Sequence, residues 1–345
     1  MIEDLLGRAR QRGYPLIIAE LGAKYAPVPD ILKAASLARD AGADVVKFQS
    51  FTAEAVATPG ASFLDKDGND IPQTEFFRRY QLNHEDHRAL VEGCQSYGIP
   101  WFSTPSCPGD VELLERFSPI CYKTGSDDLT NLLLLRAIAR TRRSVILSTG
   151  MSTLHEVERA VDTVVAAGGR VAAVLHCVTS YPSPVEEANL RAIETLRTHL
   201  KLPIGLSDHT QGAYTSVLAT MLGAEVIEKH FTPDHALKLP DDEVSLDPRE
   251  WKYLVDQVAL VPKALGDGIK RVQNAELKWH RVARKSLFAS RDIAAGSSIS
   301  EADLMVLRPL LGIPAEEIDS VVGRSVARRV LKGEPLHWDL LQPIR

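Results

Sequence analysis

Short apolar segments alternate with amphipathic helical segments along residues 1–266. Eight of the apolar segments have little polar alternation, which is the pattern of strands buried on both faces of a sheet. They are Leu16–Leu21, Val45–Ser50, Trp101–Ser103, Ile120–Thr124, Ser144–Ser148, Val171–Cys177, Pro203–Ser207 and Glu225–His230. Eight βα units over about 265 residues predict an α/β fold of the (β/α)8 TIM-barrel type. A doubly wound sheet is disfavoured because no GxGxxG motif follows the first strand.

The intervening segments carry helix boundary signals. Thr153 to Glu156 has the sequence of a capping box, and the apolar residues that follow recur on one helical face. Pro29 lies where a first helical turn tolerates proline, and Gly42 follows the last periodic residue of the same segment. These signals support helices between the predicted strands.

The pattern changes after Gly266. Residues 267–284 are charged and lack a clear apolar stripe, so we interpret them as a linker. Residues 285–345 consist of short strands and turns and contain a weak internal repeat, in which Asp292–Ile299 resembles Arg329–Leu336. A domain of about 60 residues buries little surface, so we expect it to dock on another surface.

Composition excludes several classes of protein. The formal net charge is -5 and no Lys/Arg-rich face is apparent, which argues against nucleic-acid binding. No apolar stretch approaches the ~20 residues that span a bilayer, and the acidic amino terminus lacks a signal-peptide core. The four cysteines are widely spaced and form no CxxC pair. Cysteines of this kind in a cytosolic enzyme are mostly buried free thiols. We therefore expect a cytoplasmic protein with no membrane partner.

Polar and ionisable residues occur at the carboxyl end of every predicted strand. In a TIM barrel these ends share one rim, where the chemistry takes place. The residues are Glu20, Lys47, Gln49, Thr104, Lys123, Ser126, Asp128, Ser148, Thr179, Tyr181, Ser207, His209, Glu228 and His230. Their convergence predicts an active site at this rim.

His209 and His230 follow the seventh and eighth strands, which are neighbours in a closed barrel. Two imidazoles on adjacent strand ends can share one metal ion, with oxygen ligands completing its shell. No cysteine ligand is close in the sequence, so Mn²⁺ or Mg²⁺ fits better than structural zinc. The alternative is a pair of hydrogen-bonded core histidines.

Lys47 and Lys123, together with the hydroxyls of the rim, resemble a pocket for a phosphate and a neighbouring carboxylate. Lys47 alternatively forms a Schiff base or extends to the rim. Glu20, Asp128 and Glu228 are candidate acid/base catalysts, although carboxylates that pair with a nearby lysine are equally ordinary.

Ordered motifs across nearly the whole chain closely resemble the N-acetylneuraminate (sialic acid) synthase family. The motifs are Ile18–Gly22, Gly42–Gln49, Phe102–Pro105, Ile146–Met151, His176-Cys177 with Tyr181-Pro182, Ser207–Thr210 and Glu228–Phe231. The tail is similar to the antifreeze-like (SAF) domain of that family, with Arg308-Pro309 in the characteristic place.

The resemblance implies a TIM barrel with a small, mostly β SAF domain, in a domain-swapped homodimer. It implies a metal-dependent condensation of phosphoenolpyruvate with an N-acylhexosamine-type sugar aldehyde, such as N-acetylmannosamine, to give a nonulosonic acid and phosphate. The metal would be Mn²⁺, with Mg²⁺ and Co²⁺ as alternatives, held by His209 and His230. Phosphoenolpyruvate would contact Thr104, Lys123, Ser126, Ser148 and Ser207; the sugar would contact Glu20, Lys47, Gln49, Tyr181 and Asp241, and Arg308 of the other subunit.

The sequence departs from the family mainly in segments expected to face the sugar. Lys24-Tyr25-Ala26-Pro27 replaces a segment that usually contains amide and imidazole side chains. Thr179, in the predicted substrate site, stands where Asn is common, Asp127 where Gly is common, and Leu310-Leu311 follows Arg308-Pro309. The departures concern the identity of the acceptor sugar more than the chemistry.

Two other functions are compatible with parts of the sequence. A class I or metal-dependent pyruvate aldolase acting on a sugar acid would use the same barrel and would release pyruvate without phosphate. A surface-binding protein is suggested by the similarity of the tail to ice-binding modules, but such a protein needs no rim of ionisable groups.

Overall fold

The computed structural model describes residues 1–64 and 69–343. It divides into two compact units, Met1–Gly266 and Asp267–Arg345. No helix among the described residues is long and apolar enough to cross a membrane. All four cysteines are free, and Cys94, Cys121 and Cys177 are buried.

The first unit is a closed barrel of eight parallel strands in the order β1-β10-β9-β8-β7-β6-β5-β2, which confirms the predicted (β/α)8 fold. The strands are β1 (Leu16–Glu20), β2 (Val45–Ser50), β5 (Trp101–Pro105), β6 (Tyr122–Lys123), β7 (Ser144–Ser148), β8 (Arg170–Cys177), β9 (Ile204–Asp208) and β10 (Val226–His230). Each lies within two residues of a segment predicted from the apolar pattern.

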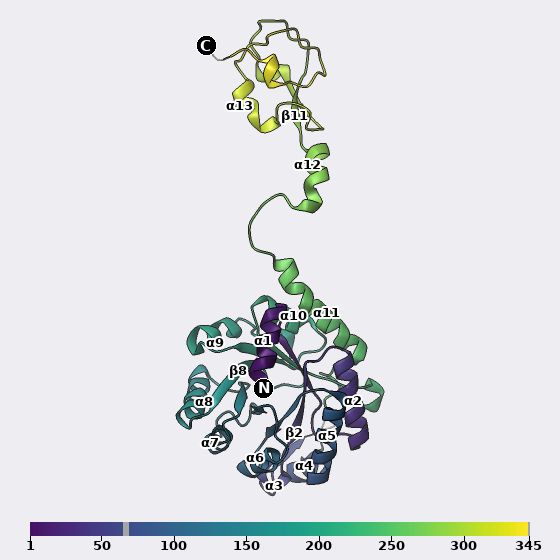
Figure 1. Ribbon diagram of the computed structural model, residues 1–345, viewed down its shortest axis with the longest axis vertical. Coiled ribbons are helices and arrows are strands. Elements are labelled where there is room, and N and C mark those ends of the chain that lie inside the picture. Colours follow the sequence, from purple (N-terminus) through teal and green to yellow (C-terminus); the bar gives the residue numbers. More distant parts are fainter. Residues whose placement is uncertain (65–68, 344–345) are drawn as a thin grey trace. The chain divides into compact units, whose positions relative to one another are not determined.

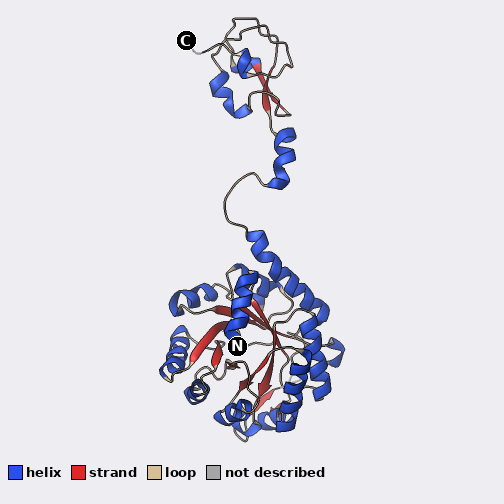
Figure 2. Ribbon diagram, viewed as in Figure 1, coloured by secondary structure: helices blue, strands red, loops and turns tan. Residues whose placement is uncertain are grey.

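Helices surround the strands as an outer ring (Figures 1 and 2). They are α2 (Val28–Asp40), α3 (Ala53–Val56), α4 (Gln73–Tyr80), α5 (His84–Tyr97), α6 (Pro108–Glu115), α7 (Leu132–Arg140), α8 (Leu154–Ala166), α9 (Ala192–Leu200), α10 (Tyr214–Met221) and α11 (Pro248–Leu265). The predicted capping box is present, because the Thr153 side chain accepts from the Glu156 backbone and begins α8. Pro29 lies in the first turn of α2, as predicted.

Successive strand residues point alternately into the barrel and toward the helices. The outward residues, such as Ile17, Val46, Leu147 and Ile227, pack in the large core between strands and helices. Inside the barrel, four apolar residues near the amino end are each followed two positions later by a polar one. These pairs are Val45 and Lys47, Phe102 and Thr104, Ile146 and Ser148, and Val226 and Glu228. The alternation therefore places the polar groups together toward the carboxyl ends.

Helix α1 (Ile2–Arg12) closes the amino-terminal end of the barrel. Its buried residues Ile2, Leu6 and Ala9 pack against inward apolar residues, including Leu16 and Phe102. The lower half of the barrel is thus filled with apolar side chains, and the polar groups above them are accessible only from the carboxyl end.

The connection between β2 and β5 contains the short helices α3 and α4 and a hairpin formed by β3 (Ser62–Leu64) and β4 (Asp70–Pro72). Aromatic rings stack edge to face along this connection: Phe76 contacts both Phe77 and Tyr80, and Phe77 contacts Phe51. The insertion provides an apolar wall beside the carboxyl end of β2.

The second unit pairs β11 (Ser286–Ala289) antiparallel with β12 (Leu304–Leu307) and has α13 (Ile318–Val321) and a small apolar core. The internal repeat has a structural counterpart. Ile293 and Val330, at equivalent positions of the two copies, exchange backbone hydrogen bonds. Gly296 and Gly333, also equivalent, both adopt positive φ. Within the expected linker, residues 274–276 form a 3-10 turn and Leu277–Ala283 forms α12.

Candidate active site

A cavity of about 400 Å³ lies at the carboxyl ends of the barrel strands. Its lining includes most of the residues that the strand ends predicted: Lys47, Gln49, Thr104, Lys123, Ser126, Asp128, Ser148, Thr179, Tyr181, Ser207, His209, Glu228 and His230. Asp241, which the family resemblance implied, lines it as well. Glu20 is buried beside the cavity and contacts it through Lys47. Arg308 belongs to the second unit, in which its side chain is exposed.

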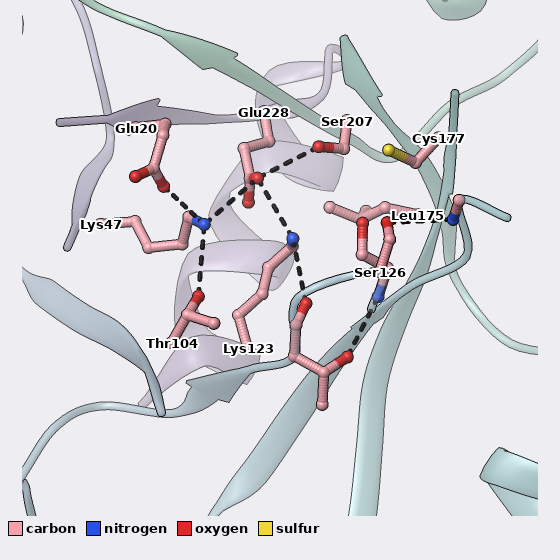
Figure 3. A network of polar contacts seen from close by, with 12 residues as sticks. Glu20, Lys47, Thr104, Lys123, Ser126, Leu175, Cys177, Ser207 and Glu228 are labelled. Carbon is pink, nitrogen blue, oxygen red and sulfur yellow. Dashed lines mark hydrogen bonds and ion pairs between the residues drawn. The ribbon is translucent and has the colours of Figure 1, made fainter. Parts of the chain in front are cut away.

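Lys47 lies at the floor of the cavity among oxygen atoms (Figure 3). Its Nζ is 2.5 Å from Oε2 of Glu20 and 3.5 Å from Oε1 of Glu228, and it donates to Oγ1 of Thr104 at 3.3 Å. Burial disfavours the charge, but Glu20 and Glu228 outweigh burial and raise the pKa of Lys47. The amine is therefore held as an ammonium.

Lys123 shares Glu228 with Lys47 (Figure 3). Its Nζ lies 3.2 Å from Oε1 of Glu228, which also accepts from Oγ of Ser207 at 3.2 Å. Burial opposes the Glu228 charge, yet the two lysines lower its pKa to about 2. The lysines predicted to form an anion pocket are thus partly compensated by Glu20 and Glu228, and the cavity floor is a buried network of mixed charge.

Oε2 of Glu228 is buried and makes no hydrogen bond. Burying a polar atom without a partner is costly, and such atoms in native sites usually await a ligand, ion or water. This oxygen is the acceptor of the network that remains available to a bound molecule.

His209 and His230 lie on the same side of the cavity with ring centroids 5.4 Å apart, and the Tyr181 ring lies 4.1 Å from His209. Nδ1 of His209 lies 3.1 Å from the carbonyl oxygen of Val178 and donates to it. Burial lowers the pKa of His209, but contacts with the Cys177 thiol and the Val178 carbonyl outweigh burial and raise it. Burial lowers the pKa of His230 to about 3, against the attraction of Asp241 at 3.4 Å, so this imidazole is neutral. A neutral imidazole is the form that binds a metal.

The donor set of this pair fits a divalent metal. Two imidazole nitrogens come from adjacent strands, and the Asp241 carboxylate lies beside His230. A mixed nitrogen and oxygen set leaves positions for substrate oxygens or water. A second group, His235, Asp247 and Glu250, also has closely spaced ligand atoms, but the two carboxylates form the capping box of α11.

Small side chains form another part of the cavity wall. The backbone N–H of Gly150 donates to Oγ of Ser126 at 3.0 Å. A Cβ atom at Gly150 would lie 2.0 Å from Oγ1 of Thr179 and 2.7 Å from Oγ of Ser126. Glycine is therefore required for these two hydroxyls to converge here.

Asp128 extends to the cavity from the segment after β6, and its Oδ1 accepts from the Asn131 amide at 2.8 Å. Burial raises the pKa of Asp128 to about 6, although the Asn131 bond opposes the shift. A carboxyl group that titrates near neutral pH in a pocket is a candidate acid or base.

Some lining residues had no sequence signal. Phe51, Val56 and Phe77 form an apolar part of the wall and belong to the insertion after β2. Tyr25, in the segment that departs from the sialic acid synthase pattern, also lines the cavity; burial and its hydrogen-bonded neighbour Asp241 raise the pKa of its phenol. The apolar residues become recognisable only once the connection folds over the barrel rim.

Comparison with known proteins gives consistent matches over nearly the whole chain. Residues 34–270 match the NeuB family and residues 284–342 match the SAF domain. N,N'-diacetyllegionaminic acid synthase of Campylobacter jejuni is 37% identical, with 92% of this chain and 98% of that chain covered. Pseudaminic acid synthase of the same species is 34% identical, with 93% and 94% covered. The crystal structure of an N-acetylneuraminic acid synthetase from Leptospira borgpetersenii with citrate superposes with a TM-score of 0.69 at 32% identity, with 78% of this chain and 90% of that chain covered.

Proposed function

The chain belongs to the NeuB family and is a condensing enzyme of the nonulosonic acid synthase type; on that premise we propose that it joins phosphoenolpyruvate to an N-acylated hexosamine aldehyde. In this reaction C3 of phosphoenolpyruvate bonds to the aldehyde carbon and water adds at C2. The C2–O bond to phosphate then breaks, and a nine-carbon 2-keto acid and phosphate result. The observation that carries the proposal is one cavity that joins two buried lysines and hydroxyls to two adjacent imidazoles.

Phosphoenolpyruvate is proposed to bind over the network of Lys123, Ser126, Ser148, Thr104 and Ser207. The ammonium of Lys123 offers charge to a phosphate or carboxylate, and the hydroxyls offer donors. The network is nearly neutral overall because Glu20 and Glu228 balance the charges of Lys47 and Lys123, so a bound anion exchanges charged partners with these carboxylates. Preorganised charges of this kind stabilise the charge that develops during the reaction.

Proton transfer is assigned to Asp128 on the strength of its pKa near 6 and its place on the cavity wall. Glu20 and Glu228 are proposed to keep Lys47 protonated, in which form it orients the acceptor with Gln49. A protonated Lys47 is a poor nucleophile, which disfavours a Schiff-base aldolase at this residue.

His209 and His230 are proposed to hold a divalent ion, with Mn²⁺ preferred and Mg²⁺ or Co²⁺ as alternatives. When bound, the ion supplies Lewis-acid polarisation of the acceptor aldehyde. Asp241, beside His230 and hydrogen-bonded to Tyr25, is proposed to fix the orientation of that imidazole and to contact sugar hydroxyls.

The acceptor is proposed to carry N-acetyl groups. Gln49 and Glu20 provide polar contacts near the floor, and Phe51, Val56 and Phe77 provide an apolar wall that suits acetyl methyl groups. The similarity to a diacetyllegionaminic acid synthase supports an acceptor with two such groups, whereas N-acetylmannosamine carries one.

The SAF domain is proposed to cap the barrel of a partner subunit in a swapped homodimer, with Arg308 reaching an acyl carbonyl of the sugar. The match of residues 284–342 to the SAF domain motivates this assignment, and the Arg308 side chain is exposed in that unit. A cytoplasmic location follows from the same proposal, because phosphoenolpyruvate is a cytoplasmic metabolite.

The function is tested by incubating the full chain with phosphoenolpyruvate, Mn²⁺ and a panel of mono- and diacetamido hexoses while phosphate release is followed. We expect stoichiometric phosphate and keto acid with at least one acetamido sugar. Pyruvate release without phosphate, or trapping of Lys123 or Lys47 by borohydride, would establish the aldolase alternative instead.

A further inference from the structure

Asp208 and Lys229 form a buried ion pair on the outer side of the barrel, facing the helices. Asp208 ends β9 and directly precedes His209, whereas Lys229 lies in β10 between Glu228 and His230. The two residues are register partners in the sheet, and they are 2% and 1% exposed. Neither lines the cavity, so the chemistry proposed above makes no direct use of them.

The Lys229 ammonium binds the backbone on both sides of His209. Its Nζ donates to the carbonyl oxygen of Thr210 at 2.6 Å and to that of Asp208 at 3.4 Å. It also lies 3.4 Å from Oδ2 of Asp208. A single side chain of the His230 strand therefore fixes the backbone that carries His209.

Asp208 in turn attaches this backbone to helix α10. Its Oδ1 accepts from the backbone N–H and hydroxyl of Thr210 at 2.9 and 2.8 Å. Its Oδ2 accepts from the hydroxyls of Thr215 and Ser216, at the start of α10, at 2.8 and 2.6 Å. Every oxygen of the carboxylate is satisfied, so the turn after β9 has one well-defined conformation.

A buried ion pair of this kind is weak evidence for stability, because the cost of removing two charges from water offsets much of their attraction. Its geometric effect is more specific. A metal held by only two protein imidazoles depends on their mutual placement, and the groups behind metal ligands commonly set that placement. Here Val178 and Asp241 contact the imidazoles themselves. Asp208 and Lys229 act one step further back, on the backbone segments that carry both histidines.

We propose that Lys229 and Asp208 are positioning residues that set the relative placement of the His209 and His230 imidazoles for a divalent ion. The proposal rests on the proposed metal function of the two histidines. It assigns to the outer side of β9 and β10 a role in metal affinity, without any contact to metal or substrate.

The test is the double variant Asp208→Asn/Lys229→Met, which removes both charges together and keeps an oxygen acceptor at position 208. We expect the variant to fold, with Mn²⁺ affinity weakened at least tenfold when free Mn²⁺ is measured by electron paramagnetic resonance during titration. The Mn²⁺ concentration that half-saturates turnover should rise by the same factor. The phosphoenolpyruvate KM, measured at saturating Mn²⁺, should change less than threefold.

The control is Glu115→Gln/Arg143→Met, which removes both charges of a partly exposed ion pair. Arg143 also pairs with a carboxylate, at 2.6 Å from Glu115, and also donates to a backbone carbonyl, that of Pro119, but it lies near the amino end of β7, where α1 closes the barrel. We expect unchanged Mn²⁺ affinity in this control. If the double variant does not fold, the alternative is Thr215→Val/Ser216→Ala, which removes two hydrogen bonds to Asp208 and keeps its ion pair with Lys229. We then expect a threefold loss of Mn²⁺ affinity.

Unchanged Mn²⁺ affinity in a folded Asp208→Asn/Lys229→Met variant overturns the positioning proposal and leaves the metal centre intact. Equal losses in the variant and its control also overturn it, because general destabilisation then explains the effect. Absence of Mn²⁺ binding to the unaltered protein refutes the metal centre itself, and the positioning proposal with it, while phosphate release remains a separate test of the condensing function.

Discussion

The Nζ atom of Lys123 lies 3.2 Å from Oε1 of Glu228, although their strands β6 and β10 are separated by three others in the barrel order. The ion pair thus crosses the barrel interior. Glu228 also forms an ion pair with Lys47. Its carboxylate therefore connects strands β2, β6 and β10. The polar floor of the cavity behaves as one network, and removal of any member changes the electrostatic surroundings of the others.

Replacing Lys123 by Met should weaken phosphoenolpyruvate binding. A charged hydrogen bond contributes ~1.5–3 kcal/mol, which corresponds to a loss of about tenfold to a hundredfold in affinity. The double variant Lys123→Met/Glu228→Gln separates loss of the cation from repulsion by an uncompensated carboxylate. Unchanged phosphoenolpyruvate affinity, with only the sugar bound more weakly, would mean that the anion pocket is elsewhere.

Exhaustive chelation should abolish activity, and Mn²⁺ should restore it. His209→Ala and His230→Ala should each prevent this recovery, because each removes one of the two proposed imidazole ligands. Phosphate release measured with and without added Mn²⁺ gives the answer. Full activity of either variant in chelator would refute the metal assignment.

Gly150→Ala should impair phosphoenolpyruvate binding, because the new Cβ would meet Thr179 and Ser126 at 2.0 and 2.7 Å and push their hydroxyls apart. We expect at least a tenfold increase in the phosphoenolpyruvate KM. The control is Gly7→Ala in α1, where nothing lies within 4 Å of the new atom and the helix should gain about 0.5–1 kcal/mol. A normal KM in Gly150→Ala would show that these hydroxyls do not contact the substrate.

Asp128→Asn should change the pH dependence of stability. The folded pKa of Asp128 is raised to about 6 from its ordinary value of 3.8, so the folded state binds more protons than the unfolded state between these values. The destabilising contribution of wild-type Asp128 therefore grows as the pH rises through this window and is complete above pH 6. Urea unfolding should show that the free energy of unfolding of the variant, relative to that of wild type, is higher at pH 7 than at pH 4. If the free energies of unfolding of variant and wild type differ by the same amount at both pH values, the raised pKa of Asp128 is contradicted.

Arg308→Ala should raise the sugar KM more than the phosphoenolpyruvate KM, by about tenfold to a hundredfold if the guanidinium binds an acyl carbonyl with ~1.5–3 kcal/mol. An ordinary surface arginine would change binding by no more than about 0.5 kcal/mol.

Mixing Arg308→Ala subunits with His209→Ala subunits tests the swap. In a swapped heterodimer one site combines intact histidines with the arginine of the partner, so activity should return at that site. No recovery, despite demonstrated subunit exchange, would favour an arginine that acts within its own subunit or not at all.

Local sequence was sufficient to predict the barrel and most of its polar rim. Each strand is a short apolar run, and groups such as Glu20, Lys123 and His209 come at or just after its carboxyl end. In a parallel barrel these ends necessarily meet, so a one-dimensional pattern predicts a three-dimensional cluster. The internal repeat is likewise visible in the sequence, but only the structure shows that its equivalent residues Ile293 and Val330 pair.

The direction of each side chain was decided only by the tertiary structure. Strands buried on both faces lack polar alternation, so the sequence does not distinguish Ser207 and Glu228, which face the cavity, from Asp208 and Lys229, which face the helices. The apolar wall residue Phe77 comes from a connection whose path no local pattern predicts. The sharing of Glu228 by two lysines depends on closure of the barrel, because distances across its interior are set by all eight strands together.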